Sequence, residues 1–227
     1  MLGLDPSVTV VFWDDSSVLD GGEKEQGRSM QDILILGAAG MLGHRVVAGL
    51  IADSRVEKLT LHDIVAAERP NTAQAVEIVA SDFTAPGEVE KLVAGRPDTI
   101  FHLAAVVSGE AEADFEKGYR VNLDGTRALL EAIRKIGGGY RPRVVFSSSL
   151  AVFGAPLPEI IPDDQILSPL SSYGAQKAAG ELLIQDYTRK GFIDGIGLRL
   201  PTVCVRPGKP NKAASGFFSG IIREPLN

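Results

Sequence analysis

The fold of this chain is decided by residues 33–43, which read Ile33-Leu34-Ile35-Leu36-Gly37-Ala38-Ala39-Gly40-Met41-Leu42-Gly43. The apolar run at the start is typical of a buried strand. Three regularly spaced glycines follow, and an apolar pattern of helical spacing continues through Val46, Val47 and Leu50. A strand, a glycine turn and a helix N-terminus together favour a pyrophosphate, because backbone N–H groups face the anion. The G-x-x-G-x-x-G spacing is weak alone, and a plain strand–helix turn is the alternative.

Strand and helix patterns alternate along the rest of the chain. We expect further strands at 58–63, 75–80, 99–105, 143–146 and 195–200. We expect helices from 41 to about 54, near 86–93, over 113–136 and 171–190, and from 215 onward. Strands separated by helices imply a parallel sheet covered on both faces. The predicted fold class is therefore α/β, a doubly wound parallel sheet of the Rossmann type.

Two acidic residues follow strands at the edge where a dinucleotide would lie. Asp63 ends the second strand and could accept hydrogen bonds from an adenosine ribose, which favours NAD over NADP because a carboxylate repels a 2′-phosphate. A cap of the next turn is the alternative for Asp63. Asp82 follows the third strand and could bond an adenine amino group or cap the helix near 86–93. Both readings of Asp82 stay open.

The segment Tyr173-Gly174-Ala175-Gln176-Lys177 places a phenol and an ammonium one helical turn apart. A free tyrosine has a pKa of about 10, and a nearby cation lowers it by stabilising the phenolate. Such a phenolate could remove a proton from an alcohol. Ser149 ends the fifth strand and could hold the reacting oxygen against Tyr173. A surface pair on a helix is the alternative for Tyr173 and Lys177.

Other polar residues fall where burial is expected. His102 lies in an apolar run and is predicted to be a packed core histidine. Asn122 falls on a helix face that can be buried, where an amide needs a partner. Ser147 and Ser148 are predicted to be structural, one of them satisfying backbone at the strand end.

Composition limits the function classes. The formal net charge is −6, and the absence of a basic stripe argues against nucleic-acid binding. No apolar run approaches the roughly 20 residues that span a bilayer, so we expect no membrane segment. The single cysteine, Cys204, fits a reducing compartment, and we expect a cytoplasmic protein without a metal ion.

These motifs together resemble the extended short-chain dehydrogenase/reductase superfamily, also described as NAD-dependent epimerases and dehydratases. The resemblance covers residues 31 to about 206. It rests on Gly37-x-x-Gly40-x-x-Gly43, Asp63, His102-Leu-Ala-Ala105, Asn122, Phe146-Ser-Ser-Ser149 with Val152-Phe-Gly154, and Tyr173-x-x-x-Lys177. Two departures matter. Phe153 replaces the tyrosine common in the family, and Ser147-Ser148-Ser149 replaces the Thr-Asp-Glu of dehydratases, which disfavours dehydration.

The resemblance implies a catalytic set and a cofactor. Ser149, Tyr173 and Lys177 match the family's catalytic residues, and Asn122 matches an asparagine that supports a proton relay to the lysine. The resemblance implies NAD as the cofactor. The implied cofactor-binding residues are Gly37, Gly40, Met41, Leu42, Gly43, Asp63, Asp82, Phe83, Leu103, Ala104, Ala105, Asn122, Tyr173, Lys177, Pro201 and Val203.

The segments 106–114 and 206–219 are similar to those of dehydrogenases that oxidise the C2 hydroxyl of a four-carbon sugar acid to the 2-oxo acid with NAD. The residues expected to bind such an anionic substrate are Ser108, Ser149, Tyr173, Arg206, Lys209, Asn211 and Lys212. A solvated loop is the alternative for the cationic segment. Two other functions stay open: a nucleotide-sugar epimerase of the same superfamily, and an NAD-binding protein without activity.

The expected organisation has three parts. Residues 1–29 form an N-terminal extension, 30–205 an NAD-binding domain with the catalytic residues, and 206–227 the start of a substrate lobe. Family members run to roughly 300 residues, so we expect this lobe to be incomplete and activity to depend on that. Family members often pair through the helices that carry Asn122 and Tyr173, so the resemblance leaves a homodimer open.

Overall fold

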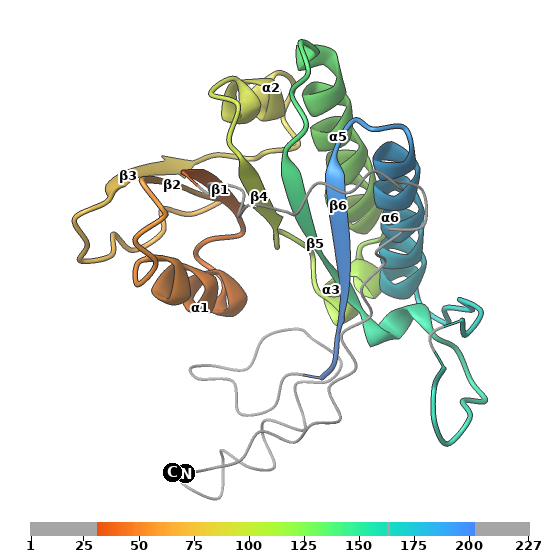
Figure 1. The fold of residues 1–227 in the computed structure, drawn as a ribbon. Coiled ribbons are helices and arrows are strands. Elements are labelled where there is room, and N and C mark those ends of the chain that lie inside the picture. The colour runs from red at the N-terminus through yellow and green to blue at the C-terminus, as the bar shows by residue number, and fades with distance from the viewer. Residues whose placement is uncertain (1–30, 163, 203–227) are drawn as a thin grey trace, which may run out of the picture.

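The computed structural model describes residues 31–162 and 164–202, and these form one parallel sheet with helices on both faces. The strands are β1 (Asp32–Leu36), β2 (Lys58–Asp63), β3 (Ala75–Ala80), β4 (Thr99–His102), β5 (Arg143–Ser149) and β6 (Asp194–Leu200). Their order is β3-β2-β1-β4-β5-β6, and every neighbouring pair is parallel (Figure 1). The doubly wound α/β prediction is confirmed. The strand order reverses at the neighbouring pair β1 and β4, and doubly wound sheets bind ligands in the crevice outside the carboxyl ends of the strands at such a point.

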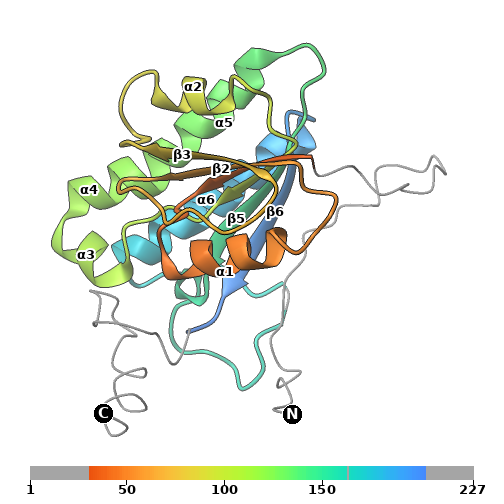
Figure 2. The same ribbon diagram turned by 90° about the vertical axis from the view of Figure 1, so that its left-hand side faces the viewer.

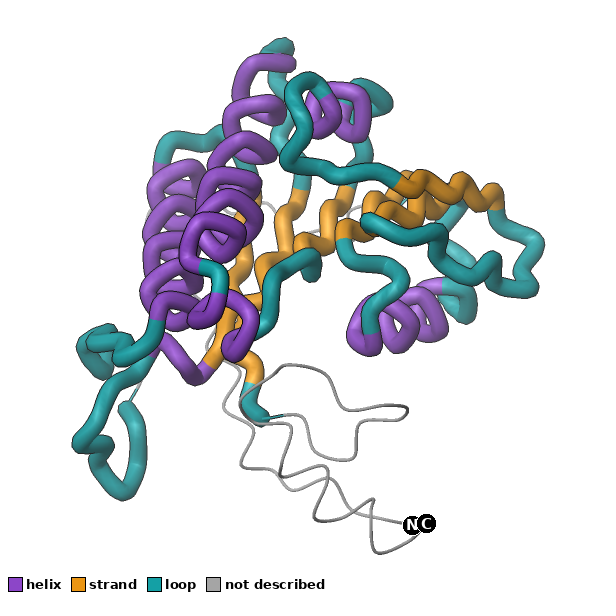
Figure 3. Tube along the Cα trace, turned by 180° about the vertical axis from the view of Figure 1, so that it is seen from behind, coloured by secondary structure: helices purple, strands orange, loops and turns teal. Residues whose placement is uncertain are grey.

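The helical segments are α1 (Met41–Leu50), α2 (Glu88–Val93), α3 (Ser108–Ala113), α4 (Phe115–Tyr119), a π-helical turn η2 (Arg120–Asp124), α5 (Gly125–Ile136), a 3₁₀ turn η3 (Leu150–Val152) and α6 (Ser172–Arg189). Figure 2 shows α1 on one side of the sheet, with α2 and α5 on the other. Figure 3 shows α5 and α6 side by side over the strands, and these two helices are in contact.

Two apolar cores explain these layers, because side chains along each strand alternate between the faces. Ile33 and Ile35 of β1 point into the α1 core, which also holds Val47, Leu59 and Leu61. Leu34 and Leu36 point into the opposite core. That core also holds Val89, Val93, Ile100, Leu129, Leu130, Ile133, Val144, Phe146 and Ile184. Thus β1 is buried on both faces, as its unbroken apolar sequence predicts.

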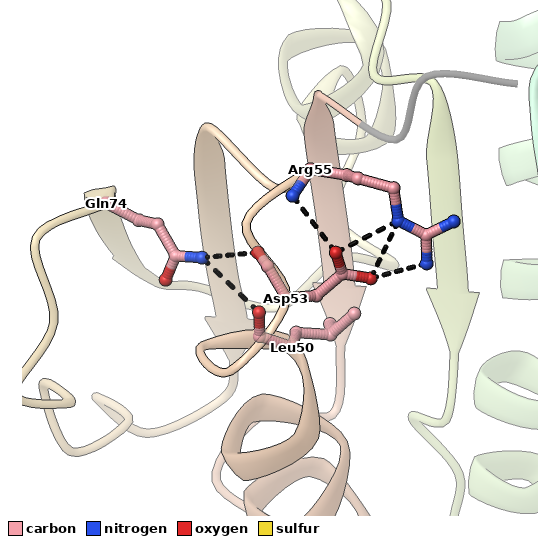
Figure 4. A network of polar contacts seen from close by, with 4 residues as sticks. All are labelled: Leu50, Asp53, Arg55 and Gln74. Atoms are coloured by element: carbon pink, nitrogen blue, oxygen red, sulfur yellow. Dashed lines mark hydrogen bonds and ion pairs between the residues drawn. The ribbon is translucent and has the colours of Figure 1, made fainter.

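The first helix is shorter than predicted, ending at Leu50 rather than near Ser54. Figure 4 shows the reason: the Gln74 amide donates to the carbonyl oxygens of Leu50 at 3.3 Å and Asp53 at 3.1 Å. The Asp53 carboxylate also accepts from the backbone N–H and the guanidinium of Arg55. The Gln74 amide thus satisfies carbonyl groups that a longer helix would have used, and the Asp53 carboxylate satisfies the Arg55 N–H.

The prediction of one continuous helix over 113–136 is wrong, because this segment is divided into shorter helices. Asp114 has φ −128° and ψ 86°, which separates α3 from α4, and its carboxylate accepts from the Lys117 N–H at 3.0 Å. The π-helical turn η2 then inserts before α5. An aspartate that caps a helix favours a break of this kind.

The remaining boundaries lie close to the predictions. β4 ends at His102 instead of Ala105, and β5 continues through Ser149. The proposed extension at 1–29 and the proposed lobe at 206–227 lie outside the described residues. None of the described helices is long and apolar enough to cross a membrane. Within 31–162 and 164–202 there is also no group of three or more His, Cys, Asp or Glu residues able to hold a metal.

Candidate active site

The glycine turn between β1 and α1 contains three glycines with different surroundings. Gly37 has φ +91°, and a Cβ added there would lie 2.7 Å from the Ala104 nitrogen. A Cβ on Gly43 would lie 2.3 Å from the Gly37 carbonyl oxygen, so the fold itself requires both glycines. Gly40 is exposed, and the nearest atom to an added Cβ there is 3.3 Å away. The Gly37 carbonyl oxygen is the single described atom within 4 Å of that position, so Gly40 is crowded on one side and could be approached by a ligand from its exposed side.

The N-terminus of α1 lies beside the same glycine. Gly40 is its N-cap and provides no side-chain hydrogen bond, and the first turn carries no acidic residue. The first N–H groups of a helix have no partner inside the helix and attract anions. Met41 and Leu42 are half-buried in this turn. The turn thus has the shape and polarity that a pyrophosphate requires.

Asp63 is fixed beside the glycine turn. Its carboxylate accepts from the Ala39 N–H at 3.0 Å and from the Ile64 N–H at 2.7 Å. The bond from Ile64 is the cap of the turn after β2 that the sequence offered as the alternative for Asp63. The bond from Ala39 holds the Asp63 carboxylate against the glycine turn. Each carboxylate oxygen accepts more than one hydrogen bond, so these contacts leave Asp63 able to meet a ribose hydroxyl.

Asp82 caps its own turn. Its carboxylate accepts from the Thr84 hydroxyl at 2.6 Å and the Thr84 N–H at 2.9 Å, and these bonds hold the Asp82 pKa below its usual value. The alternative reading as N-cap of the next helix is wrong, because α2 begins at Glu88 with Gly87 as its N-cap. The Phe83 side chain is 6% exposed and packs in the core, so only its backbone can reach a cofactor.

The end of β4 lies against the glycine turn. The Leu103 N–H donates to the Leu36 carbonyl at 2.9 Å, and Gly37 packs on Ala104 as described above. Ala104 and Ala105 are half-buried, and their small side chains leave room along this edge. The glycine turn and residues 103–105 therefore lie next to one another at the carboxyl ends of β1 and β4.

His102 is a core residue, as its apolar neighbours predict. It is 1% exposed, its Nε2 lies 2.8 Å from the Thr126 hydroxyl, and burial lowers its pKa to about 3. The Thr126 hydroxyl donates to the Asn122 carbonyl at 2.8 Å, so it must accept from His102. His102 is thus neutral with its proton on Nε2.

The structure brings the ends of β5 and α6 together. Ser149 is the last residue of β5, and its hydroxyl accepts from the Ala151 N–H at 3.1 Å. A Cβ on Gly174 would lie 2.1 Å from the Ala151 carbonyl, so the first turn of α6 packs directly on the segment after Ser149. Tyr173 lies in that turn, and the Lys177 ammonium is 5.7 Å from its ring centroid.

Lys177 is a buried cation. Its side chain is 2% exposed, its ammonium donates to the Ser147 carbonyl at 2.7 Å, and it lies 4.8 Å from the Phe146 ring centroid. Burial lowers the Lys177 pKa to about 7. An ammonium has three donors. The Ser147 carbonyl takes one of these donors, which leaves others for a phenolate or a sugar hydroxyl.

The structural roles predicted for the two preceding serines are confirmed. The Ser147 hydroxyl donates to the His102 carbonyl at 3.1 Å, which satisfies backbone between β4 and β5. The Ser148 hydroxyl donates to the buried carboxylate of Glu181.

Asn122 has the partners that its burial requires. It is 1% exposed in η2, and its side-chain oxygen accepts from the Val106 N–H at 2.8 Å. Its amide nitrogen donates to the Val106 carbonyl at 3.0 Å and to the Gln176 side-chain oxygen at 2.7 Å. π-helical turns occur often at functional sites.

The remaining predicted binding residues lie at the start of α3, just after β6, or outside the described residues. Ser108 begins α3 and is half-buried, and Pro201 is exposed after β6. Val203, Arg206, Lys209, Asn211 and Lys212 lie outside the described residues.

Sequence reasoning missed two groups. One is Gln176, and the other is the pair of Glu181 and Arg199, whose guanidinium and carboxylate are 2.8 Å apart with side chains 3% and 7% exposed. Glu181 lies one turn beyond Lys177 on the same helix face, and this spacing was the available signal.

Comparison with known proteins gives consistent matches. The family model described as "NAD dependent epimerase/dehydratase family" matches residues 33–226. The chain is 50% identical over 205 residues to D-erythronate dehydrogenase of Cupriavidus necator, a match that covers 86% of this chain and 62% of that protein. It is 48% identical over 197 residues to D-erythronate dehydrogenase of Haemophilus influenzae, with the same two coverages.

A solved structure agrees. The nucleoside-diphosphate-sugar epimerase from Agrobacterium tumefaciens is 58% identical, with a TM-score of 0.84, and the match covers 92% of this chain and 63% of that one. The chain thus spans about 62% of the length of the curated relatives it matches.

Proposed function

Since the chain belongs to the NAD dependent epimerase/dehydratase family, we propose that it takes part in the NAD-dependent oxidation of a hydroxyl group on a small sugar acid. The observation that carries this proposal is the buried Lys177 beside Tyr173 at the carboxyl end of β5. The glycine turn and Asp63 lie at the carboxyl ends of β1 and β2, on the same edge of the sheet.

The residues of the crevice fit NAD. The pyrophosphate would lie over Gly40 and the first turn of α1, where no side chain competes for the N–H groups. Asp63 would accept from the ribose hydroxyls, and its charge disfavours a 2′-phosphate. Asp82 and the backbone of Phe83 would lie by the adenine, and the small residues Ala104 and Ala105 would leave room along the strand ends.

Bound NAD would accept a hydride from the alcohol carbon. Tyr173 would remove the alcohol proton as a phenolate, because the Lys177 ammonium and the oxidised cofactor both stabilise its negative charge. Ser149 would donate to the reacting oxygen and hold it in place. Lys177 would bond the ribose while Ser147 and Phe146 fix its position.

Asn122 would complete the set. Its side chain is fully engaged with Val106 and Gln176, so its part would be to hold the π-helical turn beside Lys177. That role fits the relay that the family resemblance implies.

The substrate we propose is a four-carbon sugar acid, oxidised at C2 to the 2-oxo acid. The two D-erythronate dehydrogenases support this choice, since each is similar over 86% of the chain. Ser108 would contact a substrate hydroxyl. Arg206, Lys209, Asn211 and Lys212 would bind the carboxylate, because clustered cations and donors suit an anion.

A nucleotide-sugar epimerase is the second candidate, supported by the name of the Agrobacterium structure. An epimerase returns the hydride to its substrate and so releases no net NADH. The third candidate is an NAD-binding protein without turnover, which would bind NAD and form no NADH from any sugar acid.

The test measures NADH absorbance with purified protein, NAD and either C3 to C6 sugar acids or UDP-sugars. We expect NADH with D-erythronate and none with UDP-sugars. NAD binding without NADH from any sugar acid would reject the dehydrogenase.

The matched variant is Tyr173→Phe. It keeps the ring beside Lys177 and removes the phenol, so NAD affinity should stay the same while oxidation falls by about 10²-fold or more. Oxidation at the native rate would remove Tyr173 from the proposed role.

A further inference from the structure

A buried pair of amides joins the helix of Tyr173 and Lys177 to the π-helical turn. Gln176 is 0% exposed and Asn122 is 1% exposed. The Asn122 amide nitrogen donates to the Gln176 oxygen at 2.7 Å. Because Gln176 immediately precedes Lys177, this bond reaches α6 in its N-terminal part, beside the proposed catalytic residues.

The direction of the Gln176 amide is determined by its neighbours. The backbone of Val106 donates to the Asn122 oxygen at 2.8 Å and accepts from its nitrogen at 3.0 Å, so Asn122 can adopt only one orientation. That orientation presents an N–H to Gln176, which must therefore turn its oxygen toward Asn122.

The amide nitrogen of Gln176 is consequently left in an apolar space. This buried Nε2 finds no hydrogen-bond partner among the residues the structure describes. A Cβ added to Gly118 would lie 2.7 Å from Nε2 and 3.1 Å from the Ala111 Cβ, so α3 and α4 close around the amide. A buried donor without a partner destabilises a fold.

A residue with such a cost for stability points to a function elsewhere. The far end of the bridge is Val106, between the crevice residues 103–105 and Ser108 at the start of α3. The near end is one residue from Lys177. The bridge therefore links the two sides of the proposed reaction: the base on α6 and the segment where cofactor and substrate would lie.

We propose that Gln176 is a positioning residue that couples α6 to the segment 103–108 through Asn122. Its effect on catalysis rests on the proposed function above, whereas its effect on the segment does not. Loss of the bridge would let the segment move relative to Tyr173 and Lys177, and catalysis depends steeply on such geometry.

The test compares Gln176→Met with Gln185→Met. Methionine is unbranched and similar in size, so it removes the acceptor for Asn122 and also the unpartnered donor. Gln185 is an exposed glutamine on the same helix and supplies the matched control.

Three measurements follow on the full chain. For Gln176→Met we expect backbone amides of 103–108 to exchange hydrogen faster, because the Val106 N–H loses a fixed acceptor. We expect the thermal midpoint to stay about level, since the variant removes the unpartnered Gln176 donor but leaves one Asn122 N–H without its acceptor. With D-erythronate, kcat should fall about tenfold with KM for NAD little changed. Gln185→Met should change none of these.

Unchanged exchange at 103–108, or a thermal midpoint that falls with the activity, would overturn the proposal. Failure of Gln176→Met to fold would also overturn it, because the proposal requires a stability close to that of the wild type. If the wild-type chain oxidises no sugar acid, the proposed function is wrong, and the exchange and stability measurements still decide the role of Gln176.

Discussion

The buried ion pair between α6 and β6 gives the sharpest prediction about stability. Arg199 donates to the Glu181 carboxylate through Nε at 3.0 Å and through Nη2 at 2.8 Å, and the Ser148 hydroxyl donates to the same carboxylate. The side chains are 3% and 7% exposed. Glu181→Gln keeps the shape and removes the negative charge.

The magnitude follows from burial. Removing one partner of a buried pair leaves an uncompensated charge and typically costs about 3–5 kcal/mol. A domain of this kind is stable by only about 5–15 kcal/mol in total. Glu181→Gln should therefore lose a large share of the stability, and salt should hardly alter that loss because the site is shielded from solvent.

The matched control is Asp186→Asn on the same helix. Asp186 pairs with Arg189 across one turn, and these side chains are 56% and 67% exposed. Exposed pairs contribute about 0–1 kcal/mol and are screened by salt. The difference between the two variants in the free energy of unfolding therefore reports the effect of burial, because both substitutions lie on the same helix.

The assay is urea unfolding of both variants at low and at high salt. A double variant, Glu181→Met with Arg199→Met, should be more stable than Glu181→Gln alone, because no buried charge remains unpaired. If Glu181→Gln costs no more than Asp186→Asn, the pair does not hold α6 on β6 and the reasoning is wrong.

Three other changes test the crevice. Gly40→Ala should weaken NAD binding by about tenfold or more and lower the thermal midpoint much less than Gly43→Ala, because the added Cβ would lie 3.3 Å from the Gly37 carbonyl oxygen in the first variant and 2.3 Å from it in the second. Calorimetric titration with NAD measures the dissociation constant of each variant. An unchanged affinity for NAD in Gly40→Ala would show that the pyrophosphate does not bind over Gly40. Asp63→Ala should narrow the preference for NAD over NADP, measured as a ratio of kcat/KM values; an unchanged ratio would remove the ribose contact. Burial lowers the Lys177 pKa to about 7, so above that pH the unfolded chain binds more protons at this residue than the folded chain. The free energy of unfolding should therefore rise from pH 7 to pH 9 in the wild type relative to Lys177→Met, and parallel pH profiles would contradict the buried lysine.

The parts of the fold set by local pattern were predictable. The apolar run at 33–36, the glycines after it and the repeated strand–helix alternation predict a parallel sheet with β1 in the interior. The end of α1 was not predictable, because Gln74 lies far along the chain from Leu50 and reaches it only after β2 and β3 have paired.

Some residues of the candidate site were likewise predictable from the sequence, and others were not. Tyr173 and Lys177 share a helix face by spacing alone, and Ser149 follows from the end of an apolar strand. The partner of Asn122 could not be inferred, because Gln176 becomes its neighbour only when η2 adds a residue to the helical turn. A single sequence carries no periodic signal for that extra residue.

Three buried polar side chains of α6 reach three different elements of the fold, two of them from adjacent residues and the third from one turn further along the helix. Gln176 reaches Asn122 in η2, Lys177 reaches the Ser147 carbonyl in β5, and Glu181 reaches Arg199 in β6. Each contact is buried and each comes from a different element. Because the three partners lie in separate elements, a movement of α6 away from any one of them would break a buried contact, and these contacts together would keep Tyr173 against the end of β5. All of these contacts lie within residues 122–199, so the position of the base is set inside the sheet domain.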